Sequence, residues 1–148
     1  MVEKMNKTIY IILLIVATVI TSCQKDQEKI ELNSSLNGEW EVTAYLGDTI
    51  HGAFPLIISS DFPLKIDSVT IGDTSKYFWN FQVKVSANHE NGTFETRKSI
   101  CENCSYGIGV KVFNGKIINS DSIYLEIQFE DDETPYGNTY QLKGHRVK

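Results

Sequence analysis

The stretch that decides the fold is Ser122-Ile123-Tyr124-Leu125-Glu126-Ile127-Gln128-Phe129, in which side chains of higher and lower polarity alternate without a break. Successive side chains of a β-strand point to opposite faces, so this pattern predicts a strand with one buried and one solvated face. No window of the mature chain shows a convincing helical period. The chain is therefore expected to be all-β.

The same alternation recurs along the chain. It is strongest from Trp40 to Leu46, from Tyr77 to Val85 and from Tyr140 to Gly144. Weaker strand patterns cover residues 54–60, 65–71, 93–99 and 107–113. Asn91-Gly92 and Asn114-Gly115 are hairpin signals, because Asn and Gly tolerate positive φ. About eight strands in hairpin order predict an up-and-down antiparallel barrel, and a two-sheet β-sandwich is the alternative.

The N-terminus has the parts of a secretory signal. Lys4 and Lys7 precede a predominantly apolar stretch from Ile9 to Ile20, and Thr21-Ser22-Cys23 follows. A membrane-spanning helix needs roughly twenty apolar residues, and this stretch is shorter. Residues 1–22 are therefore predicted to be a cleaved signal peptide. The last four positions, 20–23, resemble the lipobox of bacterial lipoproteins, which implies that acyl chains on Cys23 anchor the protein to a membrane.

Cleavage leaves a mildly acidic protein. Loss of Lys4, Lys7 and Glu3 leaves 12 basic and 18 acidic residues, a net charge of −6. Because nucleic acid binding depends on a basic surface, this charge argues against a nucleic acid partner. Residues 23–35 are mostly polar and are predicted to form a flexible tether, and residues 36–148 are long enough to form one folded domain.

Lys25-Asp26-Gln27-Glu28 bears on localisation. This segment resembles the short Lys-plus-acidic signal that sends Bacteroidota lipoproteins to the outer face of the outer membrane. A plain solvated tether is the alternative. We expect a lipid anchor in the outer membrane of the cell envelope, on either its periplasmic or its external face.

Several segments of the domain resemble known proteins. Leu36-Asn37-Gly38-Glu39-Trp40 is similar to the Gly-x-Trp signature of lipocalin-like barrels. Further segments resemble, in order and spacing, a Bacteroidota lipoprotein family named lipid-binding putative hydrolase; they are residues 78–85, 114–118, 121–129 and 139–146. The resemblance covers nearly all of residues 36–148 and implies a lipocalin-like fold and a lipid ligand. It supplies no catalytic residues, so hydrolase activity rests on the family name alone.

The resemblance also implies a structural role for Trp40. In lipocalin-like barrels the early Trp closes one end, and a basic residue from the end of the barrel lies across its ring. Arg146 shares the alternation phase of Tyr140 and Leu142, so it is placed to make a cation–π contact with Trp40. A solvated side chain at a fraying C-terminus is the alternative for Arg146.

The inward phase of the predicted strands is bulky. A barrel of about eight strands either fills its interior with side chains or leaves room for one small ligand. Both interpretations are open for the candidate cavity or core residues, which are Trp40, Tyr77, Trp79, Phe81, Leu125, Ile127, Phe129 and Tyr140.

The polar motifs do not indicate a catalytic or metal-binding site. Cys101 and Cys104 have the spacing of a redox pair, but export favours a structural disulfide between them. Two cysteines do not complete a zinc site, and the three histidines lie in separate segments. The acidic run at residues 130–133 lacks the spacing of a calcium loop and is better interpreted as a solvated hairpin tip. The sequence therefore predicts no metal, no cofactor and no catalytic residues.

Two functions fit these patterns. The first is a carrier that holds a lipid or other small hydrophobic molecule. The second is a structural or accessory lipoprotein with a filled core that acts through its outer face. An open interior of several hundred Å³ would favour the carrier.

Overall fold

The structure is a computed structural model that describes residues 36–60, 67–73 and 75–148. The predicted signal peptide, the predicted tether and Cys23, the predicted lipidation site, lie outside these residues. In the part of the chain that is described, no helix is both long and apolar enough to cross a bilayer.

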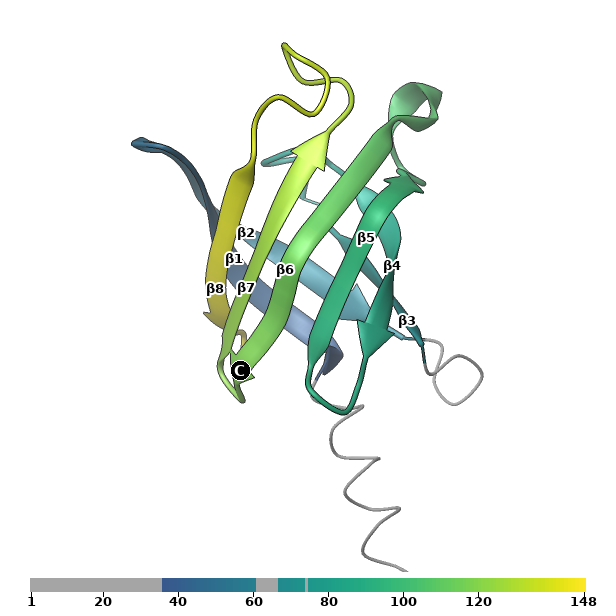
Figure 1. The fold of residues 1–148 in the computed structure, drawn as a ribbon. Coiled ribbons are helices and arrows are strands. Elements are labelled where there is room, and N and C mark those ends of the chain that lie inside the picture. Colours follow the sequence, from purple (N-terminus) through teal and green to yellow (C-terminus); the bar gives the residue numbers. More distant parts are fainter. Residues whose placement is uncertain (1–35, 61–66, 74) are drawn as a thin grey trace, which may run out of the picture. The chain divides into compact units, whose positions relative to one another are not determined.

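Antiparallel strands follow one another along the chain and around a closed barrel (Figure 1). They are β1 (Gly38–Leu46), β2 (Thr49–Ser59), β3 (Ser68–Gly72), β4 (Gln82–Asn88), β5 (Thr93–Ile100), β6 (Gly109–Asn119), β7 (Ser122–Phe129) and β8 (Tyr140–Arg146). A short 3₁₀ turn, η1 (Ser105–Gly107), lies between β5 and β6. The barrel closes because β1 pairs with both β2 and β8. The predicted up-and-down barrel is confirmed, and the sandwich alternative is wrong.

The alternation of the sequence matches the burial of the strands. On β7 the apolar side chains from Ile123 to Phe129 are buried, and each polar neighbour is partly exposed. On β1 the side chains of Trp40, Val42 and Ala44 are buried in the same way. On β1 and β7, strand periodicity therefore identified which side chains face the interior.

One predicted strand begins later than expected. The pattern from Tyr77 to Val85 predicted a continuous strand, but β4 begins at Gln82. Lys76 and Asn80 have φ of 62° and 48°, which takes the chain out of the extended conformation. Tyr77, expected on the inward face, is 79% exposed. The residues between 73 and 81 instead connect β3 to β4.

The two hairpin signals have different outcomes. Asn91-Gly92 lies in the turn between β4 and β5, as predicted. Asn114-Gly115 is not a turn, because both residues lie inside β6, where the pairing with β7 shifts between Phe113 and Lys116. Asn114 has a φ of 50°, so its positive φ serves a β-bulge and not a chain reversal. The turn after β6 comes later, around residues 119–122.

Side chains fill the interior of the barrel. A side chain that borders a void large enough for a water molecule exposes surface to that void. Inward side chains from all round the barrel expose none; they are Trp40, Val42, Ala44, Leu56, Ile71, Phe81, Val83, Val110, Val112, Leu125, Ile127, Phe129 and Leu142. These inward residues therefore form a packed core and do not line a cavity.

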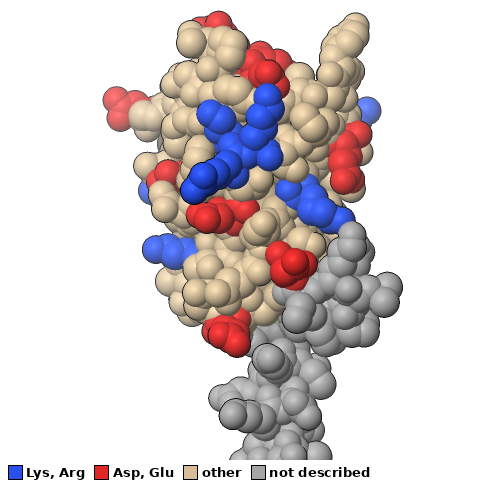
Figure 2. All heavy atoms as spheres, turned by 45° about the vertical axis from the view of Figure 1, so that its right-hand side comes forward, with Lys and Arg blue, Asp and Glu red and all other residues tan. Residues whose placement is uncertain are grey.

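The outer surface carries charges of both signs. On the face shown in Figure 2, basic side chains gather in one patch with acidic side chains around it. The formal charge of the whole chain is −5. The expectation that nucleic acid is not a partner stays a prediction.

Candidate functional site

The upper end of the barrel in Figure 1, here called the mouth, is covered by the connection between β3 and β4. Buried Asp73 holds this connection in place. Its backbone N–H donates to the Phe81 carbonyl at 2.9 Å, and its carboxylate accepts from the backbone N–H groups of Ser75 at 2.9 Å and Phe78 at 3.0 Å. Because a buried carboxylate needs such partners, the Asp73 contacts fix the course of the connection across the mouth.

Two aromatic side chains of this connection, Phe78 and Trp79, form what we call the aromatic cap. The Phe78 ring stacks on Phe54 of β2, with centroids 5.1 Å apart and planes at 16°. It also meets Tyr140 of β8 edge to face at 5.2 Å. The Phe78 ring therefore contacts β2 and β8, the two strands that flank β1 in the closed barrel.

Trp79 makes the closest ring contact of the cap. Its ring is parallel to that of Phe129 at the end of β7, with centroids 4.4 Å apart and an interplanar angle of 4°. The rings of Trp79 and Phe129 both contact Tyr140, and the Trp79 ring also contacts Phe78. Aromatic side chains therefore form the floor of the mouth and also cover it. Such pairs each contribute about 0.5–1.5 kcal/mol beyond the burial of their area.

The acidic run after β7 holds the cap from outside. The indole Nε1–H of Trp79 donates to Asp131 Oδ1 at 3.0 Å, and the Tyr140 hydroxyl donates to Asp132 Oδ2 at 3.1 Å. Burial, together with the Asp132 carboxylate, raises the pKa of Tyr140 to about 12, so its hydroxyl remains a donor. Asp131 and Asp132 thus have structural partners, and the interpretation of this run as merely solvated is incomplete.

The described residues contain no candidate metal site. Across residues 36–60, 67–73 and 75–148, no group of three or more His, Cys, Asp or Glu side chains is arranged to hold a metal ion. The histidines lie apart: His51 is on β2, where its ring meets Phe78 at 5.6 Å, His89 is in the turn after β4, and His145 is on β8.

The candidate residues divide into a core set and a mouth set. Trp40, Phe81, Leu125 and Ile127 are buried core residues. Phe129 and Tyr140 are also buried and form the floor of the mouth, whereas Trp79 is partly buried above them. Tyr77 belongs to neither set because its side chain is exposed.

The sequence patterns do not identify Phe54 and Phe78 as mouth residues. The alternation puts Phe78 on the outward face of a predicted strand, and Phe54 lies in a weak strand pattern. The usable signal was Asn80, which interrupts the aromatic run at residues 77–81 and is a residue type that accepts positive φ.

The opposite end of the barrel is closed by Trp40 and Arg146. The guanidinium carbon of Arg146 lies 4.2 Å from the Trp40 ring centroid, which confirms the predicted cation–π contact. Arg146 also donates from Nη1 to the Asn37 carbonyl at 2.7 Å and from Nε to the Ser120 carbonyl at 3.1 Å. This arrangement anchors the last strand to the start of the first.

The predicted bond between Cys101 and Cys104 is present, with Cα atoms 5.4 Å apart. It closes the loop after β5, where the Cys101 N–H donates to the Ile108 carbonyl at 2.9 Å and the Glu102 N–H to the Gln82 carbonyl at 2.7 Å. The disulfide thus stabilises a loop that backbone hydrogen bonds already hold.

Comparison with known proteins identifies a family. A family model described as lipid-binding putative hydrolase matches residues 25–147, which confirms the resemblance drawn from the sequence. No curated protein matches the chain. The family description and the barrel fold together support a role in lipid binding.

Proposed function

Since the chain belongs to the lipid-binding putative hydrolase family, we propose that it is a membrane-anchored lipoprotein whose barrel binds a lipid or other small hydrophobic molecule at the mouth. The ligand takes the place of the aromatic cap and lies on the floor that Phe54, Phe129 and Tyr140 provide.

The observation that carries this proposal is the nature of the closure. Most core side chains come from strands and are held by the barrel, whereas Phe78 and Trp79 come from a connection outside the β-ladders and are only partly buried. Displacing them breaks ring contacts and the Trp79–Asp131 hydrogen bond and leaves all strand pairing intact. The surface that Phe78 and Trp79 cover is apolar, so an acyl chain or other apolar group replaces their apolar contacts with apolar contacts of its own.

The anchor in this proposal is Cys23, with the acyl chains that the lipobox implies. Residue 36 lies at the end of the barrel opposite the mouth, next to Asn37 and its contact with Arg146. The mouth therefore lies at the opposite end of the barrel from the point at which the tether joins the domain.

Catalysis is not part of the proposal. In the described part of the chain, the hydrogen bonds that we find do not join a histidine to a serine or threonine hydroxyl, the contact that activates such a nucleophile. The outer-face accessory function remains the second candidate, because the filled interior favours it over a carrier that holds its ligand inside the barrel.

Ligand binding is tested with a fluorescent fatty acid as probe. Because Phe78 competes with the ligand for Phe54, Phe78→Ala is expected to tighten probe binding by about fivefold, the equivalent of one lost aromatic stack of about 1 kcal/mol. Tyr77→Ala in the same connection is the control and leaves affinity unchanged, since Tyr77 is exposed. A wild-type protein that does not bind the probe would favour the accessory function. Equal affinity of Phe78→Ala and wild type would remove the mouth as the site.

The anchor is tested separately by membrane fractionation. Cys23→Ser removes the proposed acceptor of the acyl chains and is expected to release the protein from the membrane fraction or to mislocalise it. A variant that fractionates like wild type would refute the lipid anchor without touching the ligand site.

A further inference from the structure

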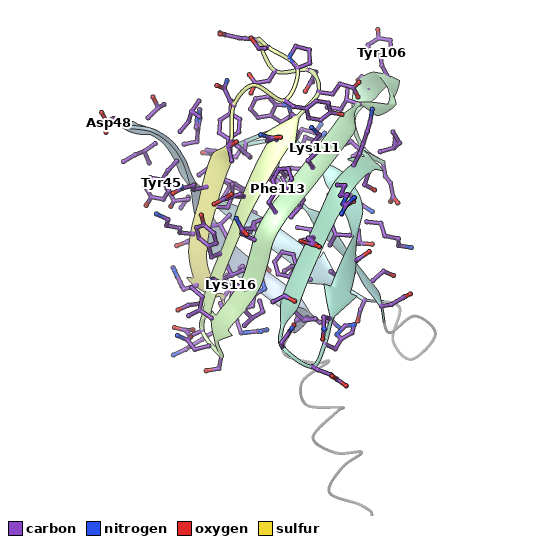
Figure 3. The ribbon with its side chains drawn as sticks, viewed as in Figure 1. Tyr45, Asp48, Tyr106, Lys111, Phe113 and Lys116 are labelled. Carbon is purple, nitrogen blue, oxygen red and sulfur yellow. A yellow bond between two sulfur atoms is a disulfide. The ribbon has the colours of Figure 1, made fainter. Side chains whose placement is uncertain are left out.

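A groove of about 860 Å³ lies on the outer face of the barrel, across the halves of β4 to β7 that are remote from the mouth. Tyr124 and Glu126 line it from β7, where they alternate with buried Ile123 and Leu125. Asn114 and Lys116 line it from β6, and Figure 3 labels Lys116 on this lower part of the strand. The volume lies in the range of roughly 300–1,000 Å³ that is typical of small-molecule sites.

The bulge in β6 shapes this groove. Asn114 adopts a φ of 50°, and Gly115 follows with its α-carbon against Phe94. A Cβ at Gly115 would collide with the Phe94 carbonyl oxygen and ring. Only glycine therefore lets β6 approach β5 here, and the bulge directs the Asn114 side chain outward into the groove.

Hydrogen bonds fix the polar side chains of the groove. The Tyr124 hydroxyl donates to Glu126 Oε1 at 2.5 Å, and Asn114 Nδ2 donates to Glu126 Oε2 at 3.1 Å. Burial and the Glu126 carboxylate raise the pKa of Tyr124 to about 12, so the hydroxyl stays protonated and the network stays intact at neutral pH. Lys116 Nζ lies 5.8 Å from the centroid of the Tyr124 ring. The network leaves one Asn114 amide N–H, its carbonyl oxygen and the Lys116 ammonium available to a ligand.

The chemistry of the lining selects among ligand classes. Glu95 and Glu126 outnumber Lys116, so the groove repels a phosphate or carboxylate. A purely apolar ligand would strip water from two carboxylates and gain no hydrogen bonds in return. A neutral ligand rich in hydroxyl groups satisfies amide, carboxylate and ammonium groups together, and its C–H faces pack on an aromatic ring such as Tyr124.

We propose that this groove is a saccharide-binding site, which takes a neutral sugar from a glycan chain or from the headgroup of a glycolipid. The saccharide packs against Tyr124 and hydrogen-bonds with Asn114 and Lys116. The site is separate from the mouth, so its occupancy does not depend on whether the mouth binds lipid.

The test is calorimetric titration of the full chain, purified in a detergent without a sugar headgroup, with neutral gluco-, manno- and galacto-oligosaccharides. Tyr124→Ala is expected to weaken binding of the preferred oligosaccharide by at least about tenfold. Lys116→Ala, a change at an exposed position that leaves the fold intact, weakens it several-fold. Titration with micelles that carry a neutral glycolipid distinguishes a headgroup from a free glycan as the source.

The barrel supplies a matched control pair. Tyr45 on β1 is also partly buried on the outer face, with Lys143 Nζ 5.2 Å from its ring centroid, and it lies outside the groove (Figure 3). Tyr45→Ala and Lys143→Ala are therefore expected to leave saccharide binding unchanged. Binding of none of the sugars, or equal losses in the Tyr45 and Tyr124 variants, would overturn the proposal.

Discussion

Replacement of Trp79 by alanine measures how firmly the aromatic cap is held. The variant loses the parallel stack on Phe129 at 4.4 Å, ring contacts with Tyr140 and Phe78, and the hydrogen bond to Asp131 at 3.0 Å. A fully buried Trp→Ala change costs about 3–5 kcal/mol, and Trp79 is only partly buried. The stack on Phe129 contributes about 1 kcal/mol beyond burial, and the lost burial of the partly buried ring together with the exposed hydrogen bond adds about as much, so the expected loss is ~2 kcal/mol.

Thermal unfolding followed by circular dichroism measures this loss. For a domain of this size, ~2 kcal/mol corresponds to a fall in Tm of ~8 °C. Tyr77→Ala, which removes an exposed ring from the same connection, is the matched control and is expected to change stability by less than about 0.5 kcal/mol. If both variants melt at the wild-type temperature, Trp79 does not pack on the mouth and the account of the cap is wrong.

Three further predictions concern other parts of the barrel. Trp40→Ala removes a fully buried ring and is expected to cost about 3–5 kcal/mol in denaturant unfolding; an unchanged midpoint would contradict its place in the core. Replacing Cys101 and Cys104 by serine opens a very short loop, so the stability loss should stay well under the ~3 kcal/mol of a fifteen-residue loop, and thiol titration of denatured, unreduced wild type should find neither thiol free. Burial lowers the pKa of His89, so the unfolded chain binds the proton more readily and stability should fall as the pH drops below about 6.5. His89→Gln should flatten that part of the stability profile, and an unaltered profile would exclude the effect.

The strands of the barrel were predictable because their signal is local. Alternation in segments such as residues 122–129 depends only on which face of a strand meets the core, and the structure buries the expected side chains. Hairpin order then limits the topology to neighbours along the chain, which is the observed arrangement.

The aromatic cap was not predictable in this way. The alternation from Tyr77 to Phe81 continues the pattern of β4, so nothing local separates strand from connection. The chain leaves the strand there because Phe78 and Trp79 contact Phe54 and Phe129, which are distant in sequence. Tertiary contacts of this kind override a local strand preference.

The bulge in β6 shows a different limit of prediction from sequence. Asn114-Gly115 indicated positive φ correctly, and the sequence favoured a hairpin because that is the commonest use of such a pair. Whether the chain reverses there or bulges depends on the pairing with β5 and β7 and on the close approach of Phe94 to Gly115. The groove depends on this bulge, so the groove could not be predicted from the sequence either.

The most direct test of ligand binding at the mouth follows the two tryptophan side chains of the protein by nuclear magnetic resonance. Trp79 is in the aromatic cap and Trp40 closes the opposite end of the barrel, so their indole N–H signals report on the two ends separately. Titration with a long-chain fatty acid is expected to shift the Trp79 signal, as its hydrogen bond to Asp131 breaks, and to leave the Trp40 signal in place. A titration that shifts the Trp40 signal and leaves that of Trp79 unmoved would contradict binding at the mouth.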